Sequence, residues 1–355
     1  MPLKEPVRHR GAIVTKQTIR FEYDTKAVWT RISGRRSVFL DSNAWIHMAD
    51  GVDGTACRVR ERLRTLVKSG QLFCPVSGGT LEELFLQAGP SLDRTAALME
   101  ELSLNACYVV RQEIFQWEFA RSLARTMNAP FDKSLKGLYV APAGYLGSCP
   151  VGSFDLPDDQ ILAPDVIANA QNCFRQHQAT VGIAELAKLL SEPNVVKEPP
   201  SYSEAAKKAM LQFKGNKSKI FVAEAENCFI IYIRPLLKRF PQFAIQKWLE
   251  QFGSSGDEQW YRNALTELPA LHNFVDLMVE ADMQPARKDS NNHFLDNEIM
   301  TAPLAYADVF VTRDKGIRDL LRNRTAVLAR TKCNYCDSLG ALELWLEATL
   351  DMDTA

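Results

Sequence analysis

The first third of the chain alternates between short apolar runs and segments in which apolar residues recur at helical spacing. A short run rich in β-branched and aromatic residues is typical of a strand that is buried on both faces. These runs occupy residues 37–40, 72–76 and 107–110. Helices are predicted between them, over residues 57–66, 81–87 and 92–104. The alternation predicts a parallel sheet that is covered by helices.

The pattern changes after about residue 110 and returns near the C-terminus. Long amphipathic helices are predicted in the middle of the chain, at residues 112–127, 165–190, 203–213, 221–238, 241–252 and 258–280. The alternating pattern then resumes, with helices at 296–306, 315–322 and 341–350 and strands at 309–312 and 326–329. Because strands from both ends of a chain can join one sheet, we expect an α/β domain with a large, mainly helical insertion.

This interpretation divides the chain into four segments. They are a basic N-terminal extension (1–35), the first part of the sheet domain (36–110), the helical insertion (111–284) and the second part of the sheet domain (285–355). The two parts of the sheet domain together have the size of one ordinary domain.

The composition is that of an ordinary globular protein, with 46% hydrophobic and 24% charged residues among 355. The formal net charge is -1, so any affinity for a polyanion must come from local basic patches. No apolar run approaches the length of a membrane span, and the first residues lack the apolar stretch of a secretory signal. We therefore expect a cytoplasmic protein with no membrane partner.

The eight cysteines are spread along the chain without the spacing of a disulfide framework. Free thiols in a reducing compartment are the simplest interpretation. Only Cys333 and Cys336 have metal-ligand spacing, but a structural zinc needs four ligands and no second pair follows. Two thiols beside a strand are therefore preferred over a zinc site.

Two predicted strands end at or just before an aspartate. The strand at 37–40 runs directly into Asp41, and the strand at 309–312 is followed two residues later by Asp314. If these strands are neighbours, both carboxylates face one crevice, because sites form outside the carboxyl ends of parallel strands. A hard divalent cation would offset their mutual repulsion. Taken singly, either aspartate could instead be a helix N-cap, and Glu83 alone could be a solvated helix residue.

Four short motifs, in this order, resemble those of the PIN-domain nucleases. FLDSN at 39–43 resembles the opening motif, with an Asn two residues after Asp41. TLEEL at 80–84 resembles the second motif, in which the Glu directly before Leu is the ligand and corresponds to Glu83. The stretch from Asp296 to Asp314 resembles the third and fourth motifs in its spacing and in the Val-Thr before the last aspartate.

The resemblance implies a three-layer α/β/α PIN-like domain and a metal-dependent endonuclease. Asp41, Glu83, Asp296 and Asp314 would hold one or two Mg²⁺ or Mn²⁺ ions, which activate a water for phosphodiester hydrolysis and stabilise the departing oxygen. Asn43 and Thr312 would orient ligands or the scissile phosphate. The products would be a 5′-phosphate and a 3′-hydroxyl. RNA is expected ahead of DNA as the substrate, because RNA is common in the family.

The chain departs from the family pattern in two respects. Pro303 falls within the helix that follows Asp296, and a proline there is expected to kink the helix or to end its first segment. Glu82 and Glu298 are nearby carboxylates that could replace the assigned ligands. Periodicity does not choose between Glu82 and Glu83; only the resemblance does.

Basic clusters lie at residues 58–68, 207–219 and 313–332. Runs of charge are usually solvated faces, but an acidic site that cuts a polyanion needs basic surroundings. The third cluster is favoured because Asp314 fixes it beside the expected site. Its predicted nucleic-acid contacts are Arg313, Lys315, Arg318, Arg322 and Arg324.

Other classes of function are compatible with parts of this pattern. A PIN-like module could bind nucleic acid or a protein partner without cutting. A phosphatase-type hydrolase with an Asp nucleophile would need a second Asp two residues after Asp41, where this chain has Asn43. A nuclease held in check by an inhibitory protein partner, as many bacterial family members are, would show no mark of that partner in the sequence.

Overall fold

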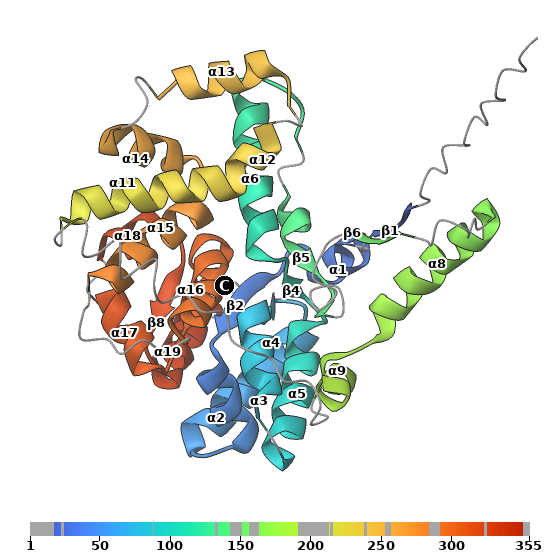
Figure 1. Cartoon of the computed structure of the whole chain (residues 1–355). Coiled ribbons are helices and arrows are strands. Elements are labelled where there is room, and N and C mark those ends of the chain that lie inside the picture. Colours follow the sequence, from blue (N-terminus) through green and yellow to red (C-terminus); the bar gives the residue numbers. More distant parts are fainter. Residues whose placement is uncertain are drawn as a thin grey trace, which may run out of the picture.

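Strands from both ends of the chain pair in one parallel sheet (Figure 1). In spatial order its strands are β3 (Leu72–Phe73), β2 (Arg36–Leu40), β7 (Val309–Val311) and β8 (Asn334–Cys336). Val38 of β2 lies opposite Val309 of β7. The α/β class and the parallel sheet that joins the two ends of the chain are therefore confirmed.

The structure is a computed structural model. It describes residues 18–22, 25–87, 89–131, 134–142, 151–155, 163–190, 213, 216–237, 240–252, 257–283, 292–322 and 325–350. Within these ranges, no helix is both long enough and apolar enough to cross a membrane.

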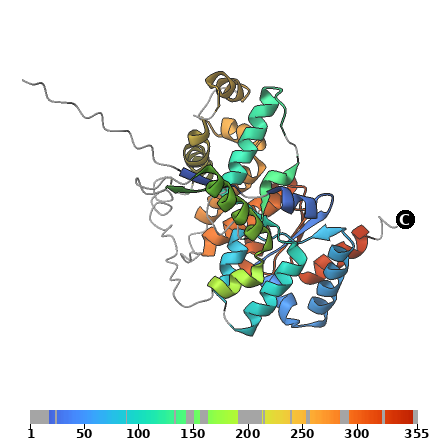
Figure 2. The same cartoon turned by 90° about the vertical axis from the view of Figure 1, so that its right-hand side faces the viewer.

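The central strands are buried because helices cover the sheet on both sides (Figures 1 and 2). Successive side chains of a strand point to opposite faces. Val38 and Leu40 therefore join one hydrophobic core, whereas Phe39 joins the other. Phe39 stacks on Phe310 of β7 with 5.8 Å between the ring centroids, which fixes the register of the two strands on that face.

The core around Val38 is enclosed mainly by helices from the first third of the chain and by the last helix. These are α2 (Ser42–Asp50), α3 (Gly54–Lys68), α4 (Gly78–Phe85), α5 (Pro90–Ser103), α9 (Ile183–Leu190) and α19 (Leu339–Leu350).

The opposite core, around Phe39, is enclosed partly by the insertion. Its helices include α1 (Thr25–Ile32), α6 (Arg111–Thr126), α15 (Pro269–Asp282), α16 (Asn292–Tyr306), α17 (Lys315–Arg322) and α18 (Thr325–Arg330). Phe115 of α6 and Phe274 of α15 belong to this core, with 5.8 Å between their centroids. The insertion therefore shares its hydrophobic core with the sheet.

The remaining helical elements of the insertion are η1 (Leu135–Leu138), α8 (Pro164–Thr180), α11 (Lys217–Cys228), the π-helical turn η2 (Phe229–Ile233), α12 (Arg234–Leu237), α13 (Gln242–Glu250) and α14 (Glu258–Thr266). Helices α11, α13 and α14 gather at one end of the molecule (Figure 1).

Three predicted helices of the insertion are interrupted or undescribed. The helix predicted at 165–190 breaks at Gly182, where a Cβ would lie 2.3 Å from Glu100 Oε2. The helix predicted at 258–280 divides into α14 and α15, because Pro269 has no N–H and fits only the first turn of a helix. The helix predicted at 203–213 lies outside the described residues except for Phe213.

Short strands complete the fold. β4 (Cys107–Tyr108) pairs antiparallel with β5 (Tyr139–Val140), and β1 (Thr18–Glu22) pairs antiparallel with β6 (Val151–Asp155). The strand predicted at 326–329 is wrong, because those residues lie in α18 and β8 supplies the outer strand. Tyr335 of β8 extends the aromatic stack onto Phe310, with 6.4 Å between centroids.

Candidate functional site

The candidate site lies at the carboxyl ends of β2 and β7. The chain passes from β2 to β3 on one side, whereas β7 lies on the other side of β2, so the order of the strands reverses there. In an open parallel sheet, crevices form outside the carboxyl ends of strands at such a point. Asp41 directly follows β2, and Asp314 N lies 3.4 Å from Asp41 Oδ2. Asp314 therefore lies next to Asp41, joined to it through its backbone N–H.

Asp41 is 2% exposed and ties the two strand ends together. Its Oδ1 accepts a hydrogen bond of 2.7 Å from Ala44 N and so caps α2. Its Oδ2 accepts hydrogen bonds from Thr312 Oγ1, from Arg313 N at 3.0 Å and, more weakly, from Asp314 N. The carboxylate therefore holds the loop after β7 against the start of α2.

The environment of Asp41 disfavours its charge. Burial raises the pKa of Asp41 above its usual value, and the hydrogen bonds from Thr312 and from the three backbone amides oppose that rise. Because burial prevails, ionising this carboxyl is unfavourable without a compensating positive charge. A divalent cation with oxygen ligands is one group that would compensate.

Asp314 is half-buried and caps the following helix, α17. Its Oδ1 accepts a hydrogen bond of 2.9 Å from Ile317 N, and its own N–H donates to Thr312 Oγ1 at 3.0 Å. Its Oδ2 makes no hydrogen bond with any described residue. Asp314 thus keeps one carboxylate oxygen for a ligand.

The other two predicted carboxylates come from helices that pack against each other, α4 and α16. Glu82 and Glu83 are both half-buried on α4, so burial does not choose between them. Asp296 lies near the start of α16, and its side chain, like that of Glu298, is outside the described part of the structure. The helix continues past Pro303 to Tyr306, so of the two expected effects of this proline, a kink or a helix end, the end does not occur.

A complete metal cluster is not assembled among the described side chains, where no three His, Cys, Asp or Glu residues are grouped to hold an ion. One Asp314 oxygen has no hydrogen bond to a described residue, whereas both oxygens of Asp41 accept hydrogen bonds. Glu83 does not join the two aspartates in a group of this kind. Carboxylate oxygens are the donors that a hard cation prefers, so Asp314 is the described residue with an oxygen open to one.

Of the two residues expected to orient ligands, Thr312 is well placed for that role. Its buried hydroxyl donates to Asp41 and accepts from Asp314 N. Asn43 is exposed in the first turn of α2 and makes no side-chain hydrogen bond with the described residues.

Three basic side chains near the start of α17 form no ion pair within the described residues: Arg313, Lys315 and Arg318. Arg313 and Lys315 are exposed, and Arg318 is half-buried. Arg322, one turn further along, pairs instead with Asp337 at 3.6 Å. Arg324 lies outside the described residues. Positive charge that is not neutralised therefore follows directly after β7, beside Asp41.

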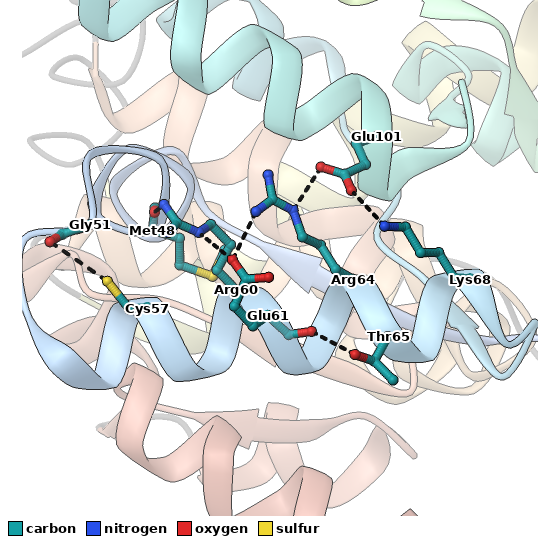
Figure 3. Close-up of polar contacts among 9 residues, drawn as sticks. All are labelled: Met48, Gly51, Cys57, Arg60, Glu61, Arg64, Thr65, Lys68 and Glu101. Carbon is teal, nitrogen blue, oxygen red and sulfur yellow. Dashed lines mark hydrogen bonds and ion pairs between the residues drawn. The ribbon is translucent and has the colours of Figure 1, made fainter.

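Three side chains of the basic cluster on α3, in contrast, pair with carboxylates from other helices. Arg64 Nε lies 2.8 Å from Glu101 of α5, and Lys68 Nζ lies 3.9 Å from the same carboxylate (Figure 3). Arg58 Nε lies 2.7 Å from Glu343 of α19. These side chains link helices across the surface, which favours α17 over α3 as a surface for a polyanion. In the cluster at 207–219, Lys207, Lys208 and Lys214 lie outside the described residues.

Cys333 and Cys336 face opposite sides of the sheet. Cys333 lies in the core around Phe39, whereas Cys336 lies in the core around Val38. Neither thiol forms a disulfide with a described cysteine, and Cys336 is the last residue of β8. Their opposite orientation does not suit a shared zinc ion.

Tyr335 is a residue of this region that the sequence did not reveal. Its hydroxyl is buried and has no hydrogen-bond partner among the described residues. The pKa of Tyr335 is raised to about 12, first by burial and then by Asp337, while Arg318 acts in the opposite direction and Asp41 adds to the rise. The available signal was the aromatic residue between Cys333 and Cys336.

No protein-family model, curated protein or solved structure matches this chain. Its function must therefore be argued from the chemistry of the site.

Proposed function

We propose that this protein is a metal-dependent endonuclease with a PIN-like fold, acting on RNA ahead of DNA. The observation that carries the proposal is the hydrogen-bonded junction of Asp41, Thr312 and Asp314 at the carboxyl ends of β2 and β7. It joins the Asp41 carboxylate to the backbone of the loop that carries Asp314, at the point where the strand order reverses. A buried carboxyl with a raised pKa at such a point is a candidate functional group.

The residues divide into three roles. Asp41 and Asp314 would hold Mg²⁺ or Mn²⁺, with Glu83 and Asp296 as the expected further ligands. A bound cation supplies an activated water and stabilises negative charge on the phosphodiester. Thr312 fixes the orientation of the Asp41 carboxylate through its hydroxyl. The basic side chains at the start of α17 attract the phosphates of the strand.

A second function has an observation in its favour: a module that binds nucleic acid or a protein partner without cutting it. Asp41 and Asp314 cap helices in the same way as Asp53 and Asp257, which cap α3 and α14. An N-cap aspartate stabilises a helix without any metal. The same basic surface would then serve binding alone.

Cleavage assays with two matched variants separate these functions. Asn caps a helix about as well as Asp, so Asp314→Asn removes the ligand charge while it keeps the cap. Asp257→Asn makes the same change at the cap of α14, which lies in the insertion. Labelled single-stranded RNA and DNA are incubated with Mg²⁺, Mn²⁺ or EDTA.

A nuclease predicts metal-dependent cleavage by the wild type and by Asp257→Asn, and loss of cleavage in Asp314→Asn at a similar melting temperature. Binding without cleavage in both metals would support the second function. Normal cleavage by Asp314→Asn would refute the proposed site.

A further inference from the structure

Two buried hydrogen-bond donors without partners lie beside the Asp41 junction. Tyr335 Oη and Arg318 Nε are both buried, and neither has a hydrogen-bond partner among the described residues. Leaving a buried donor unpaired is unfavourable, so each such group in a native structure calls for a partner.

Tyr335 shares one face of the sheet with the junction. Phe39, Phe310 and Tyr335 form a continuous stack across β2, β7 and β8, so their side chains lie on the same face. Side chains alternate along a strand, and Asp41 and Thr312 are each two residues beyond a member of that stack. The acid and the threonine hydroxyl therefore emerge on the face that carries Tyr335.

Electrostatics agree with this placement. The charges of Asp337, Arg318, Arg322 and Asp41 all act on the pKa of Tyr335, so the phenol lies within electrostatic reach of α17 and of the junction. Arg322 is engaged by Asp337, whereas Arg318 forms no ion pair with a described residue. Since Arg322 lies one turn after Arg318 and contacts Asp337, two residues after Tyr335, α17 packs beside β8 with one positive charge that no described carboxylate pairs.

The chemistry of this pair suits an anionic oxygen. An arginine side chain donates hydrogen bonds and accepts none, and its planar group matches phosphate oxygens. A tyrosine hydroxyl can donate to the same oxygen. Hydrogen bonds between a charged donor and a phosphate are among the stronger ones in proteins, so a phosphate would satisfy both donors and the charge of Arg318.

We propose that Arg318 and Tyr335 bind one phosphate of the nucleic-acid strand, adjacent to the phosphate that is cut at the Asp41 junction. This inference rests on the proposed function, since the strand must lie across the carboxyl end of the sheet. The two residues position the strand and take no part in the hydrolysis itself.

The test neutralises one phosphate at a time. A series of RNA oligonucleotides is made in which a single non-bridging phosphate oxygen is replaced by methyl, and binding is measured by fluorescence anisotropy with Ca²⁺ in place of Mg²⁺. The wild type should lose about tenfold in affinity, or more, at the linkage that meets Arg318 and Tyr335. A loss of affinity at any other linkage would report a phosphate contact made by other residues.

The decisive result is the coupling between protein and linkage. Tyr335→Phe keeps the stacked ring and should bind the unmodified strand about tenfold more weakly. Methyl substitution at the sensitive linkage should then lower the affinity of Tyr335→Phe only a little further. At the other linkages the variant should lose as much affinity as the wild type does. Arg318→Gln, on the half-buried side of α17, should show the same coupling independently. Arg58→Gln on α3 removes a charge that Glu343 pairs and should keep the complete wild-type pattern.

If Tyr335→Phe and Arg318→Gln both lose as much affinity as the wild type at every methyl-substituted linkage, this inference is overturned. If the wild type still cleaves RNA with Mn²⁺ in that case, the proposed function stands without it. A wild type that binds none of the oligonucleotides would refute both.

Discussion

Glu118 offers the sharpest pH-dependent prediction, because it is a fully buried carboxyl that joins three helices. Its Oε1 accepts a hydrogen bond of 2.6 Å from Ala270 N, and its Oε2 accepts one of 3.1 Å from Leu271 N, at the start of α15. The hydroxyl of Tyr306, the last residue of α16, also donates to Oε1. Glu118 itself belongs to α6. Its ionisation state therefore affects the contact of α6 and α15 with α16, the helix that precedes β7.

Burial raises the pKa of Glu118 from 4.5 to about 7, although the bonds from Tyr306, Ala270 and Leu271 and the charge of Arg121 oppose the rise. Below pH 4.5 the side chain is protonated in both states and its stabilising contribution is complete. As the pH rises, the unfolded chain ionises first, and the contribution is lost until the folded form ionises near pH 7. The full effect amounts to ~3 kcal/mol, of which ~2 kcal/mol develops between pH 5 and pH 8.

Glu118→Gln removes this pH dependence. The amide oxygen can still accept from Ala270 N, but the amide nitrogen then faces the N–H of Leu271, which costs about 1 kcal/mol at every pH. We expect the variant to be about as stable as the wild type at pH 5 and more stable by ~2 kcal/mol at pH 8. Urea unfolding of both proteins at the two pH values measures the difference.

Comparison with the variant cancels the other groups that titrate in this range. His272 is the important one, since burial lowers its pKa from 6.5 to about 4. Its stabilising contribution is present above pH 6.5 and is lost as the pH falls toward 4, which is opposite in sign to that of Glu118. A stability difference between Glu118→Gln and the wild type that stays constant from pH 5 to pH 8 would refute the reasoning.

Three further predictions concern the site and its surroundings. Thr312→Val removes the hydroxyl whose hydrogen bond lowers the pKa of Asp41. We expect this variant to lose about 1–2 kcal/mol of stability and the acid limb of its pH–activity profile to move to higher pH. Thr312→Ser should restore both the stability and the profile. Changing Arg313 and Lys315 together to Gln should weaken RNA binding and reduce the slope of log affinity against log salt by about 1–2. An unchanged slope would show that these two side chains do not contact phosphates. Gly182→Ala would displace Glu100, whose carboxylate bonds to the first turn of α9, and thermal melts should show a loss of about 1 kcal/mol that disappears in a Glu100→Ala background.

The central sheet could be predicted from the sequence because strands buried on both faces carry a distinctive signal. The runs at 37–40 and 309–312 are almost entirely apolar and each is followed by an acid, and helices cover both of their faces. The meeting of Asp41 with Asp314 follows from parallel pairing alone, because parallel strands end at the same edge. The pairing of Leu40 with Val311 brings Thr312 opposite Asp41.

Short or interrupted elements could not be predicted in the same way. The run at 326–329 is apolar enough for a strand, but periodicity does not separate a short strand from a short buried helix, and it forms α18. Tyr335 lies in the outer strand and stacks on Phe310. This contact depends on the tertiary pairing of the strands, which the local sequence does not reveal.

Ion pairs between residues that are distant in sequence could not be predicted either. The arginines of α3 form a basic cluster in the sequence, yet Arg58 is paired with Glu343 and Arg64 with Glu101, in helices that are distant in sequence. Runs of like charge therefore become informative only when the partners supplied by the fold are known. At the start of α17, where Arg318 forms no ion pair with a described residue, the same kind of run keeps its charge.

The face of the sheet on which Asp41 emerges gives the insertion a role beyond covering the core. That face is packed by α6 and α15 from the insertion and by α16, which carries Asp296. Tyr306 ends α16 and is bonded to Glu118 of α6. The bond between Tyr306 and Glu118 therefore holds the far end of the helix that carries Asp296. Under the proposed function, Glu118→Gln should change the pH dependence of cleavage as well as that of stability, although Glu118 is far in sequence from every expected ligand.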